Sequence, residues 1–401
     1  MTSKRQGNSS DRVRAWTGPV ILTYGYRPFF LMAGAWAVLA MTFWVAMLAG
    51  WAPALTRFDP VSWHAHEMLF GFLGAVLAGF LLTAVPNWTG RLPIIGWPLA
   101  GLAGLWLLGR LAVAFAGLLS PVLVGVLDLL FPTVLAATIG REILAGQNKR
   151  NLPLLALLVL FIISNALFHV SAARGGYAAG GVGFRMGLAI AVMLVTLIGG
   201  RVIPSFTRNW LVKRKESDLP APFGVIDQAT LVVTLVSLIS WVALPDYSIT
   251  AVLSAFAGFA NLIRLSRWSP LKTRSEALLW ILHVGYLFVP LGFLAIAVSV
   301  WDFGASPPIG AQHIWMVGAV GVMPLAMMTR ASLGHAGRPL TAGRGVAAVY
   351  WLVLASVVMR FIGAFDAAPF WLMYVSALSW IAGFLGFCVL YWPILTKPRG
   401  G

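Results

Sequence analysis

Long apolar segments run through this chain and restrict what it can fold into. A helix needs roughly 20 mostly apolar residues to cross the hydrocarbon core of a membrane, whereas a barrel strand needs only about ten. Apolar residues make up 60% of the 401 residues and charged residues only 10%, and the apolar runs have the length of helices. We therefore expect an all-α, polytopic membrane protein without a soluble domain.

The charged residues between the apolar segments test how many segments cross the membrane. The expected spans cover residues 29–49, 64–85, 95–117, 119–144, 152–172, 182–203, 224–244, 247–266, 276–300, 309–330, 344–364 and 369–395. With the N-terminus inside, all but five of the 28 Lys and Arg residues lie on the inner side, in agreement with the positive-inside rule. The five exceptions are Arg57, Arg110, Arg174, Arg185 and Arg360. The sequence thus predicts twelve transmembrane helices with both termini in the cytoplasm.

This topology predicts a cytoplasmic segment over 1–28, one transmembrane domain over 29–395 and a cytoplasmic tail over 396–401. No cleavable signal peptide is visible, because residues 1–28 are polar and basic. The longest loop is expected at about 204–223, on the cytoplasmic surface. The net charge of +16 would suggest a nucleic-acid partner in a soluble protein. Here it is a topology signal, so we expect no nucleic acid.

The second and tenth spans share one layout, and each opens near a histidine. Counted from His66 and from His313, glycines fall at the same offsets of +5 and +8, and a Gly–Arg pair follows at +24 and +25. The sixth span ends with a weaker version of this pattern, around Pro204. Spans 2, 6 and 10 are four helices apart, which suggests three pseudo-repeats of four helices. Chance matches are the alternative. Membrane folds often place binding sites between such repeats.

Four histidines fall at one depth near the outer surface, namely His64, His66, His169 and His313. Imidazole is the usual nitrogen ligand of haem iron, copper and zinc. The single cysteine, Cys388, excludes an internal disulfide and a cysteine-built metal centre. The four histidines therefore suit haem, with or without copper. The alternative is a set of hydrogen-bonded residues at the membrane interface.

Helix geometry divides these histidines between two places. His64 and His66 point about 200° apart, so they cannot bind one metal unless the helix is unwound. We expect one of them to lie opposite His313 as a haem ligand and the other to face His169 in a second site. Glu67 is placed on the face of His64, where it could orient an imidazole or pass protons. The alternative is a carboxylate exposed to water.

The four glycines of the matched spans have two interpretations. Gly71, Gly74, Gly318 and Gly321 remove side chains one to two turns below the histidines. A flat macrocycle needs such room, whereas small residues also allow helices to pack closely.

Further ionisable residues mark the inner ends of spans 2, 6, 9 and 10. The arginines among them could clamp haem propionates or another anion. Positive-inside anchoring explains most of them singly. The candidates are His283, His335, Arg91, Arg201, Arg208, Arg330 and Arg338.

Arg110 and Asp128 lie nine residues on either side of Leu119, which is at the tip of the hairpin between the third and fourth spans. We expect them to form an intramembrane ion pair, since neither charge is stable alone in lipid.

Several blocks of the sequence resemble the signature blocks of the NnrS family. They are HAHEMLFGF, FLLTAVPNWTGR, NLPLL with LFH, LIGGRVIPSFTRNW, LWILHVGY and MTRASLGHAGRP, and they extend from about Tyr26 to Pro339. The resemblance implies a twelve-span protein of the bacterial inner membrane that carries haem, of the b type, and copper. It implies a link to denitrification and to resistance against nitric oxide and nitrosative stress. All six histidines lie in or beside these blocks, which makes His283 and His335 candidate ligands too.

A more distant likeness is to the catalytic subunits of haem–copper oxidases and nitric oxide reductases. Those proteins also have twelve spans, cytoplasmic termini and haem ligands that open spans 2 and 10. Span 7 of this chain lacks histidine, so the paired copper ligands of that family have no counterpart here. The likeness is one of topology alone.

Three functions remain open at this point. The first is a haem-dependent nitric oxide reductase or detoxifier, with Glu67 delivering protons and with membrane quinol or a separate cytochrome as electron donor. The second is a non-catalytic haem or copper protein that responds to nitric oxide or handles metal. The third is a secondary transporter whose helices are broken at Pro86 and Pro204.

Overall fold

The computed structural model describes residues 15–51, 55–302 and 306–398. Within these ranges every regular element is helical, and twelve helices are long and apolar enough to cross a membrane. The all-α fold and the expected number of spans are thereby confirmed. The spans are α2 (Tyr26–Leu48), α3–η2–α4 (Pro60–His66, Glu67–Phe72, Leu73–Thr89), α5 (Trp97–Ala114), α6 (Pro121–Ala145), α7 (Leu152–Ala173), α8 (Val182–Lys213), α9 (Val225–Ala243), α10 (Ser248–Ser266), α11 (Ala277–Trp301), α12–η7–α13 (Pro308–His313, Ile314–Val322, Met323–His335), α14 (Arg344–Ile362) and α15 (Trp371–Thr396).

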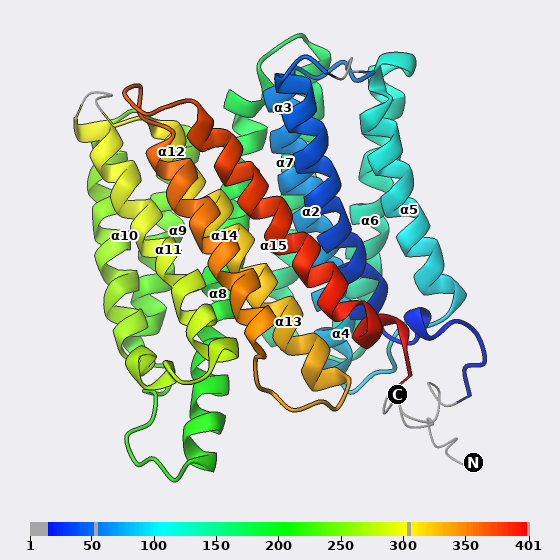
Figure 1. The fold of residues 1–401 in the computed structure, drawn as a ribbon, viewed down its shortest axis with the longest axis vertical. Coiled ribbons are helices and arrows are strands. Elements are labelled where there is room, and N and C mark those ends of the chain that lie inside the picture. Colours follow the sequence, from blue (N-terminus) through cyan, green and yellow to red (C-terminus); the bar gives the residue numbers. More distant parts are fainter. Residues whose placement is uncertain (1–14, 52–54, 303–305, 399–401) are drawn as a thin grey trace.

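The helices form one bundle, with α5 and α6 at one edge and α9 and α10 at the opposite edge (Figure 1). The last helix, α15, packs against the first, α2, where the Trp380 indole donates a hydrogen bond of 3.0 Å to the carbonyl of Ala37. At the other end of this contact, the Arg27 guanidinium donates to the carbonyls of Leu395 and Lys397. The first and last spans therefore meet at the same end of the bundle, as an even number of spans requires.

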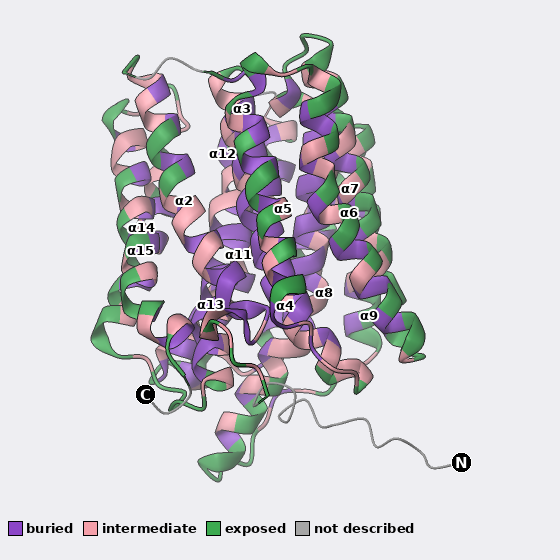
Figure 2. Ribbon diagram, turned by 90° about the vertical axis from the view of Figure 1, so that its right-hand side faces the viewer, coloured by how far each residue is buried: buried purple, intermediate pink, exposed green. Residues whose placement is uncertain are grey.

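Three spans occupy the centre of the bundle. Buried residues make up 83% of the most apolar stretch of Pro60–Thr89, 72% of that of Pro308–His335 and 67% of that of Val182–Lys213. The value for α11 is 61%, and the other eight spans lie between 33% and 44%. Figure 2 shows these inner helices largely buried and the outer faces largely exposed. Every fourth span is thus central, a pattern that agrees with three repeats of four helices.

The outer faces suit a lipid environment. Large apolar side chains such as Leu118, Val122 and Val389 are exposed on them. Exposed apolar surface of this extent marks contact with a membrane or another protein. The exposed indoles of Trp51, Trp97 and Trp371 lie at helix ends, where aromatic residues concentrate at the two membrane–water interfaces.

Two expectations about proline are wrong. Helix α8 continues through Pro204 to Lys213, so the loop expected at 204–223 is shorter, and α4 continues through Pro86. One to two turns before its proline α8 packs closely on α10, where Arg264 lies against Gly200 and donates to the carbonyl of Thr196 at 3.0 Å. Neighbouring helices commonly stabilise proline inside a span. The broken helices that would have favoured a transporter are therefore absent at both prolines.

The ends of the chain agree only in part with the expected boundaries. Helix α2 begins at Tyr26, inside the predicted segment 1–28, and α15 ends at Thr396. Residues 1–14 and 399–401 lie outside the described residues. Which side of the membrane the two ends face stays a prediction.

Three of the four glycines in the matched spans serve close packing. The space beside Gly318 is filled by the ring of Phe288, and that beside Gly321 by the indole of Trp380. At Gly71 the Arg110 guanidinium lies where a Cβ atom would stand. Only Gly74 has room for a side chain, because a Cβ atom there would lie in ordinary contact with Phe131, 3.9 Å away. Room for a macrocycle is therefore not provided at Gly71, Gly318 or Gly321.

The contrast between Gly318 and Gly74 predicts opposite effects of one substitution. Gly318→Ala forces Phe288 to move, so it should lower the free energy of unfolding by about 1–3 kcal/mol, as overpacked cores do. Gly74→Ala meets only ordinary van der Waals contact and should leave stability unchanged or raise it by roughly 0.5–1 kcal/mol. Denaturant unfolding of both variants in detergent measures the difference. Equal losses would contradict this packing.

Candidate functional site

The two matched spans share a feature of the backbone. Each begins with a short α-helix that ends at the matched histidine, His66 in α3 and His313 in α12. A π-helix follows at once in both, over Glu67–Phe72 and Ile314–Val322. Such wide turns are rare and often occur at functional sites. Within the wide turn of the second span, the carbonyl of Gly71 accepts a hydrogen bond of 3.0 Å from the Trp106 indole.

His66 points into a group of buried polar side chains from four spans. We call this group the polar cluster. Its members, all buried, are His66, Glu67, Arg110, Asp128, Asn165 and His169. They come from α3, η2, α5, α6 and two successive turns of α7. Their meeting inside the apolar part of the bundle requires that each polar atom finds a partner there.

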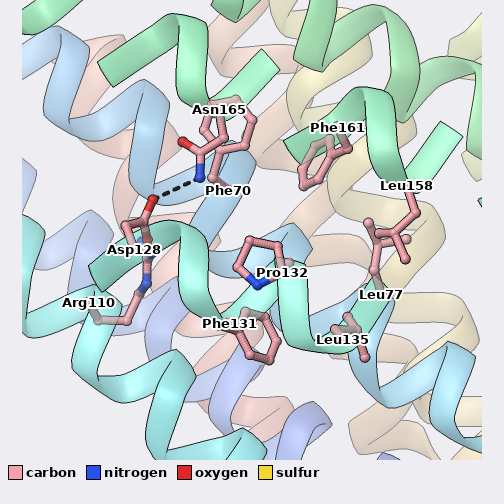
Figure 3. Close-up of a pocket in the computed structure, with 11 residues that line it drawn as sticks. Phe70, Leu77, Arg110, Asp128, Phe131, Pro132, Leu135, Leu158, Phe161 and Asn165 are labelled. Atoms are coloured by element: carbon pink, nitrogen blue, oxygen red, sulfur yellow. Dashed lines mark hydrogen bonds and ion pairs between the residues drawn. The ribbon is translucent and has the colours of Figure 1, made fainter. Parts of the chain in front are cut away.

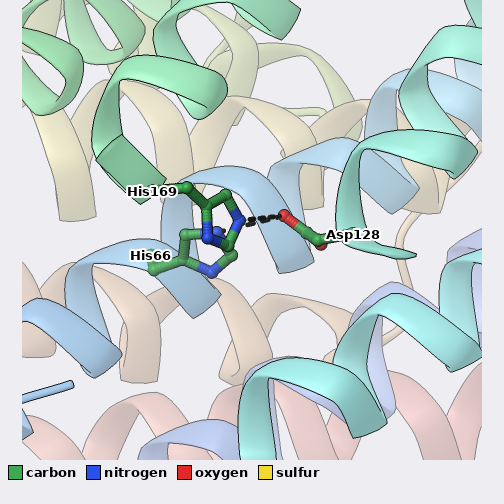
Figure 4. Close-up of side chains that lie close together, drawn as sticks. All are labelled: His66, Asp128 and His169. Atoms are coloured by element: carbon green, nitrogen blue, oxygen red, sulfur yellow. Dashed lines mark hydrogen bonds and ion pairs between the residues drawn. The ribbon is translucent and has the colours of Figure 1, made fainter. Parts of the chain in front are cut away.

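The imidazoles of the polar cluster meet on one carboxylate (Figure 4). His169 Nε2 lies 2.9 Å from Asp128 Oδ2, and His66 Nε2 lies 3.2 Å from the same oxygen. His66 Nε2 is also 3.0 Å from Asn165 Oδ1, while His66 Nδ1 lies 3.0 Å from Glu67 Oε1. The Asn165 amide in turn donates to Asp128 Oδ2 at 2.8 Å, the contact drawn in Figure 3. Both ring nitrogens of His66 are thus fixed by oxygen atoms.

One guanidinium joins the two carboxylates of the polar cluster. Arg110 donates to Glu67 Oε1 at 2.6 Å and forms an ion pair with Asp128 Oδ1. The predicted ion pair of Arg110 and Asp128 is therefore confirmed, and Glu67 extends it. Glu67 is fully buried and bonds to His66 and Arg110, so the expectation of a carboxylate beside His64 or exposed to water is wrong. Its second oxygen, Oε2, is buried and has no hydrogen-bond partner among the described residues.

The polar cluster contains a donor set that can hold one metal ion. His66, Asp128 and His169 each offer one ligand atom, and these atoms lie within 4.8 Å of one another. Two imidazoles and a carboxylate suit zinc, copper or iron. Glu67 and Asn165 contact the His66 ring and Arg110 contacts Asp128, as groups that orient metal ligands do.

His64 points to the other side of the second span and lines a separate space, which we call the histidine cavity. This space has a volume of about 80 Å³, and His313 lines it too. The remaining lining is largely apolar and includes the thioethers of Met41, Met68 and Met316. Sites for small molecules and cofactors have mostly apolar walls of this kind, although most of them are larger, at roughly 300–1,000 Å³.

Both histidines of the histidine cavity have a nitrogen suited to a ligand. The His64 ring stacks on Trp44 with its centroid 4.2 Å away, and its Nδ1 is buried with no hydrogen-bond partner among the described residues. His313 Nδ1 lies 2.7 Å from the carbonyl of Ile309, which leaves Nε2 as the nitrogen that can coordinate. The structure thus has His64 with His313 and His66 with His169. What each histidine binds stays a prediction.

The inner histidines lie apart from both groups. His283 Nδ1 is 3.1 Å from the carbonyl of Leu279, and its Nε2 is within 3.4 Å of Thr207 Oγ1. His335, at the end of α13, stacks on Tyr26 with ring centroids 5.4 Å apart. Neither lines the histidine cavity.

The inner arginines do not form one anion site. Arg91 pairs with Glu142 of α6, and Arg201 donates to Asn151 at 3.2 Å. Arg330 lies over the ring of Phe206 at 4.3 Å. The other two candidates, Arg208 and Arg338, are exposed. Their binding of a cofactor stays a prediction, and none of the five lines the histidine cavity.

Two features of these sites were missed from the sequence. Asn165 lies four residues before His169 in an otherwise apolar run, so helix periodicity would have placed it on the same face. A second buried ion pair joins Arg264 Nε to Asp227 Oδ1 at 2.9 Å, and the same guanidinium lies 3.1 Å from the Tyr286 hydroxyl. The sequence signal for this pair was a single acid, Asp227, in the apolar run of α9 and a single base, Arg264, in that of the neighbouring α10.

The fold and these sites define a class: a twelve-helix membrane protein with a histidine–carboxylate cluster and a histidine-lined cavity inside the bundle. The chain belongs to the NnrS family, because the family model described as NnrS protein matches residues 20–399. A comparison with curated proteins gave no match.

Removal of the Arg110 guanidinium, which Glu67 and Asp128 share, should strongly destabilise the protein. Arg110→Met leaves Glu67 and Asp128 buried without their cation, which should lower the free energy of unfolding by about 3–5 kcal/mol. Arg91→Met removes a partly exposed ion pair and serves as the control, with an expected loss of about 0–1 kcal/mol. Unfolding by denaturant in detergent measures both. Similar losses in the two variants would contradict the role of Arg110.

Proposed function

We propose that this protein contains haem and acts on nitric oxide, by reduction or another detoxifying reaction, at the outer side of a bacterial inner membrane. The histidine cavity is the observation that carries the proposal, because imidazoles from two matched spans, His64 and His313, line one apolar space. Membership of the NnrS family supports it, since the resemblance of the sequence blocks implies haem, copper and a response to nitric oxide.

The apolar walls and the free imidazole nitrogens of the histidine cavity suit a b-type haem, whereas its volume of about 80 Å³ is smaller than the macrocycle, so the helices around it would have to separate to admit haem. His64 and His313 would hold the haem, and Trp44 fixes the ring of His64. Bound haem would supply an iron atom as the centre for nitric oxide. The methionine side chains of the wall are flexible and adapt to an irregular ligand surface.

The polar cluster is suited to a second metal and to the handling of protons. We place copper at His66, Asp128 and His169, because these three offer ligand atoms within 4.8 Å of one another. Reduction of two nitric oxide molecules to nitrous oxide and water consumes two protons and two electrons. Glu67 Oε2, which has no partner among the described residues, is the oxygen that can accept and pass a proton.

Electrons would come from a membrane quinol or from a separate cytochrome. A lateral cavity of about 750 Å³ between α10, α11 and α14 supports the quinol. Trp280 and Trp351 line it with ring centroids 5.4 Å apart, which suits an aromatic ring, and His283 lines its inner wall. Arg274 adds a charged group to this lining.

The orientation that we propose has the histidine cavity outside and both termini in the cytoplasm. The first and last spans meet at one end of the bundle, and the positive-inside rule assigns that end to the cytoplasm. Membrane lipid then surrounds the exposed apolar faces of the outer helices.

A non-catalytic function is the second candidate, in which the protein binds nitric oxide or holds metal without turnover. The extensive hydrogen bonding of the polar cluster favours it, because Asp128 Oδ2 already contacts His66, Asn165 and His169. Such a network holds a ligand set rigidly.

Nitric oxide consumption by the purified, haem-loaded protein tests the proposal. With a quinol as donor, the wild type should consume nitric oxide, and His313→Ala should lose both haem absorbance and consumption. His335→Ala is the matched control and should keep both, because His335 lies outside the cavity. Binding without consumption supports the non-catalytic function, whereas full haem content in His313→Ala and in His64→Ala would overturn the site.

A further inference from the structure

A second cavity adjoins the histidine cavity, and the proposed chemistry does not use it. This apolar cavity lies between α2, α4, α8 and α13 and has a volume of about 60 Å³. Every residue that lines it is apolar, glycine or proline. Water has no hydrogen-bond partner among such side chains, and cavities of this kind stay dry.

The two cavities follow one another along the three central spans. On each of these spans, a residue that lines the histidine cavity is followed three or four positions later by a residue that lines the apolar cavity. This is the spacing of residues on a single helix face. The pairs that cross the junction are Phe72 and Val76, Leu188 and Ala191, and Val320 and Met323. The apolar lining is therefore continuous along one face of each helix, from His64 and His313 toward the inner ends of the spans.

The far end of the apolar cavity reaches partly exposed side chains. Phe80, Ile198 and Met327 line that end and are only half-buried. They lie within the spans, about two to four turns from the inner helix ends, so this end opens at a depth where the membrane is hydrocarbon. A molecule that enters there must be soluble in hydrocarbon and small enough to pass between packed helices.

We propose that the two cavities form one route that carries small neutral gas molecules from the hydrocarbon core of the membrane to His64 and His313. Ions and strongly polar molecules are excluded, because desolvation in an apolar cavity is costly. Nitric oxide, oxygen and xenon share the required size and lack of charge. The route rests on the cavities themselves, and only the choice of nitric oxide as its natural cargo rests on the proposed function.

Xenon tests the route without any need for haem or nitric oxide, because apolar cavities bind it. The structure of the wild type under xenon pressure should show xenon in the apolar cavity. Ala191→Leu, which fills the junction, should reduce the occupancy, and Leu194→Ala, which enlarges the cavity, should raise it. A lipid chain in the cavity, or no xenon in both the wild type and Leu194→Ala, would overturn the proposal.

The association rate of nitric oxide with the haem-loaded protein tests the conduction step. Ala191→Leu should slow association about tenfold, which corresponds to about 1.4 kcal/mol in the barrier. Leu194→Ala, which enlarges the cavity where Ala191→Leu fills it, should not slow association. A slow rate in Ala191→Leu alone therefore indicates blockage of the route, whereas slow rates in both variants would indicate disturbed folding. Xenon binding with unchanged rates in Ala191→Leu would overturn conduction. If the protein binds no haem, the proposed function fails, while the xenon result still decides whether the route exists.

Discussion

The Arg110 guanidinium, shared by Glu67 and Asp128 inside the bundle, is the interaction on which the rest of the structure depends. Charges at this depth are stable only when paired, so the second, third and fourth spans must meet where these side chains lie. Asp128 and Glu67 then hold the His66 ring, and Asn165 and His169 bring in α7. One buried ion pair thus fixes the rotation of the second span about its own axis.

This rotation decides where the outer histidines point. Residues two positions apart on a helix point about 200° from one another, so fixing His66 toward α7 turns His64 to the opposite side. There His64 lines a cavity with His313, which occupies the matched position of the tenth span. The polar cluster and the histidine cavity are consequently separate sites on two faces of one helix. A haem in one and a metal ion in the other would be served by different ligands and different surroundings.

Much of this arrangement follows from the sequence, and the remainder depends on packing. Span number, the pair of Arg110 with Asp128 and the division of His64 from His66 follow from length, charge and helical period, which are local properties. The π-helices after His66 and His313 could not be predicted, because apolar periodicity does not distinguish a wide turn from an α-helical one and contacts such as that of Trp106 with the Gly71 carbonyl come from another span. The continuation of α8 through Pro204 likewise belongs to a helix packed against other spans, as by Arg264 against Gly200. Glu67 was assigned to the wrong neighbour, since its guanidinium partner lies 43 positions away in the sequence.

His64 and His66 serve two separate sites, and the proposed placement of haem and of the second metal depends on this division. Haem absorbance and non-haem metal content, measured on the same preparations of His64→Gln and His66→Gln, test it most directly. We expect His64→Gln to lose haem and keep the other metal, and His66→Gln to lose the other metal and keep haem. Loss of the same species in both variants, or no loss in either, would contradict it.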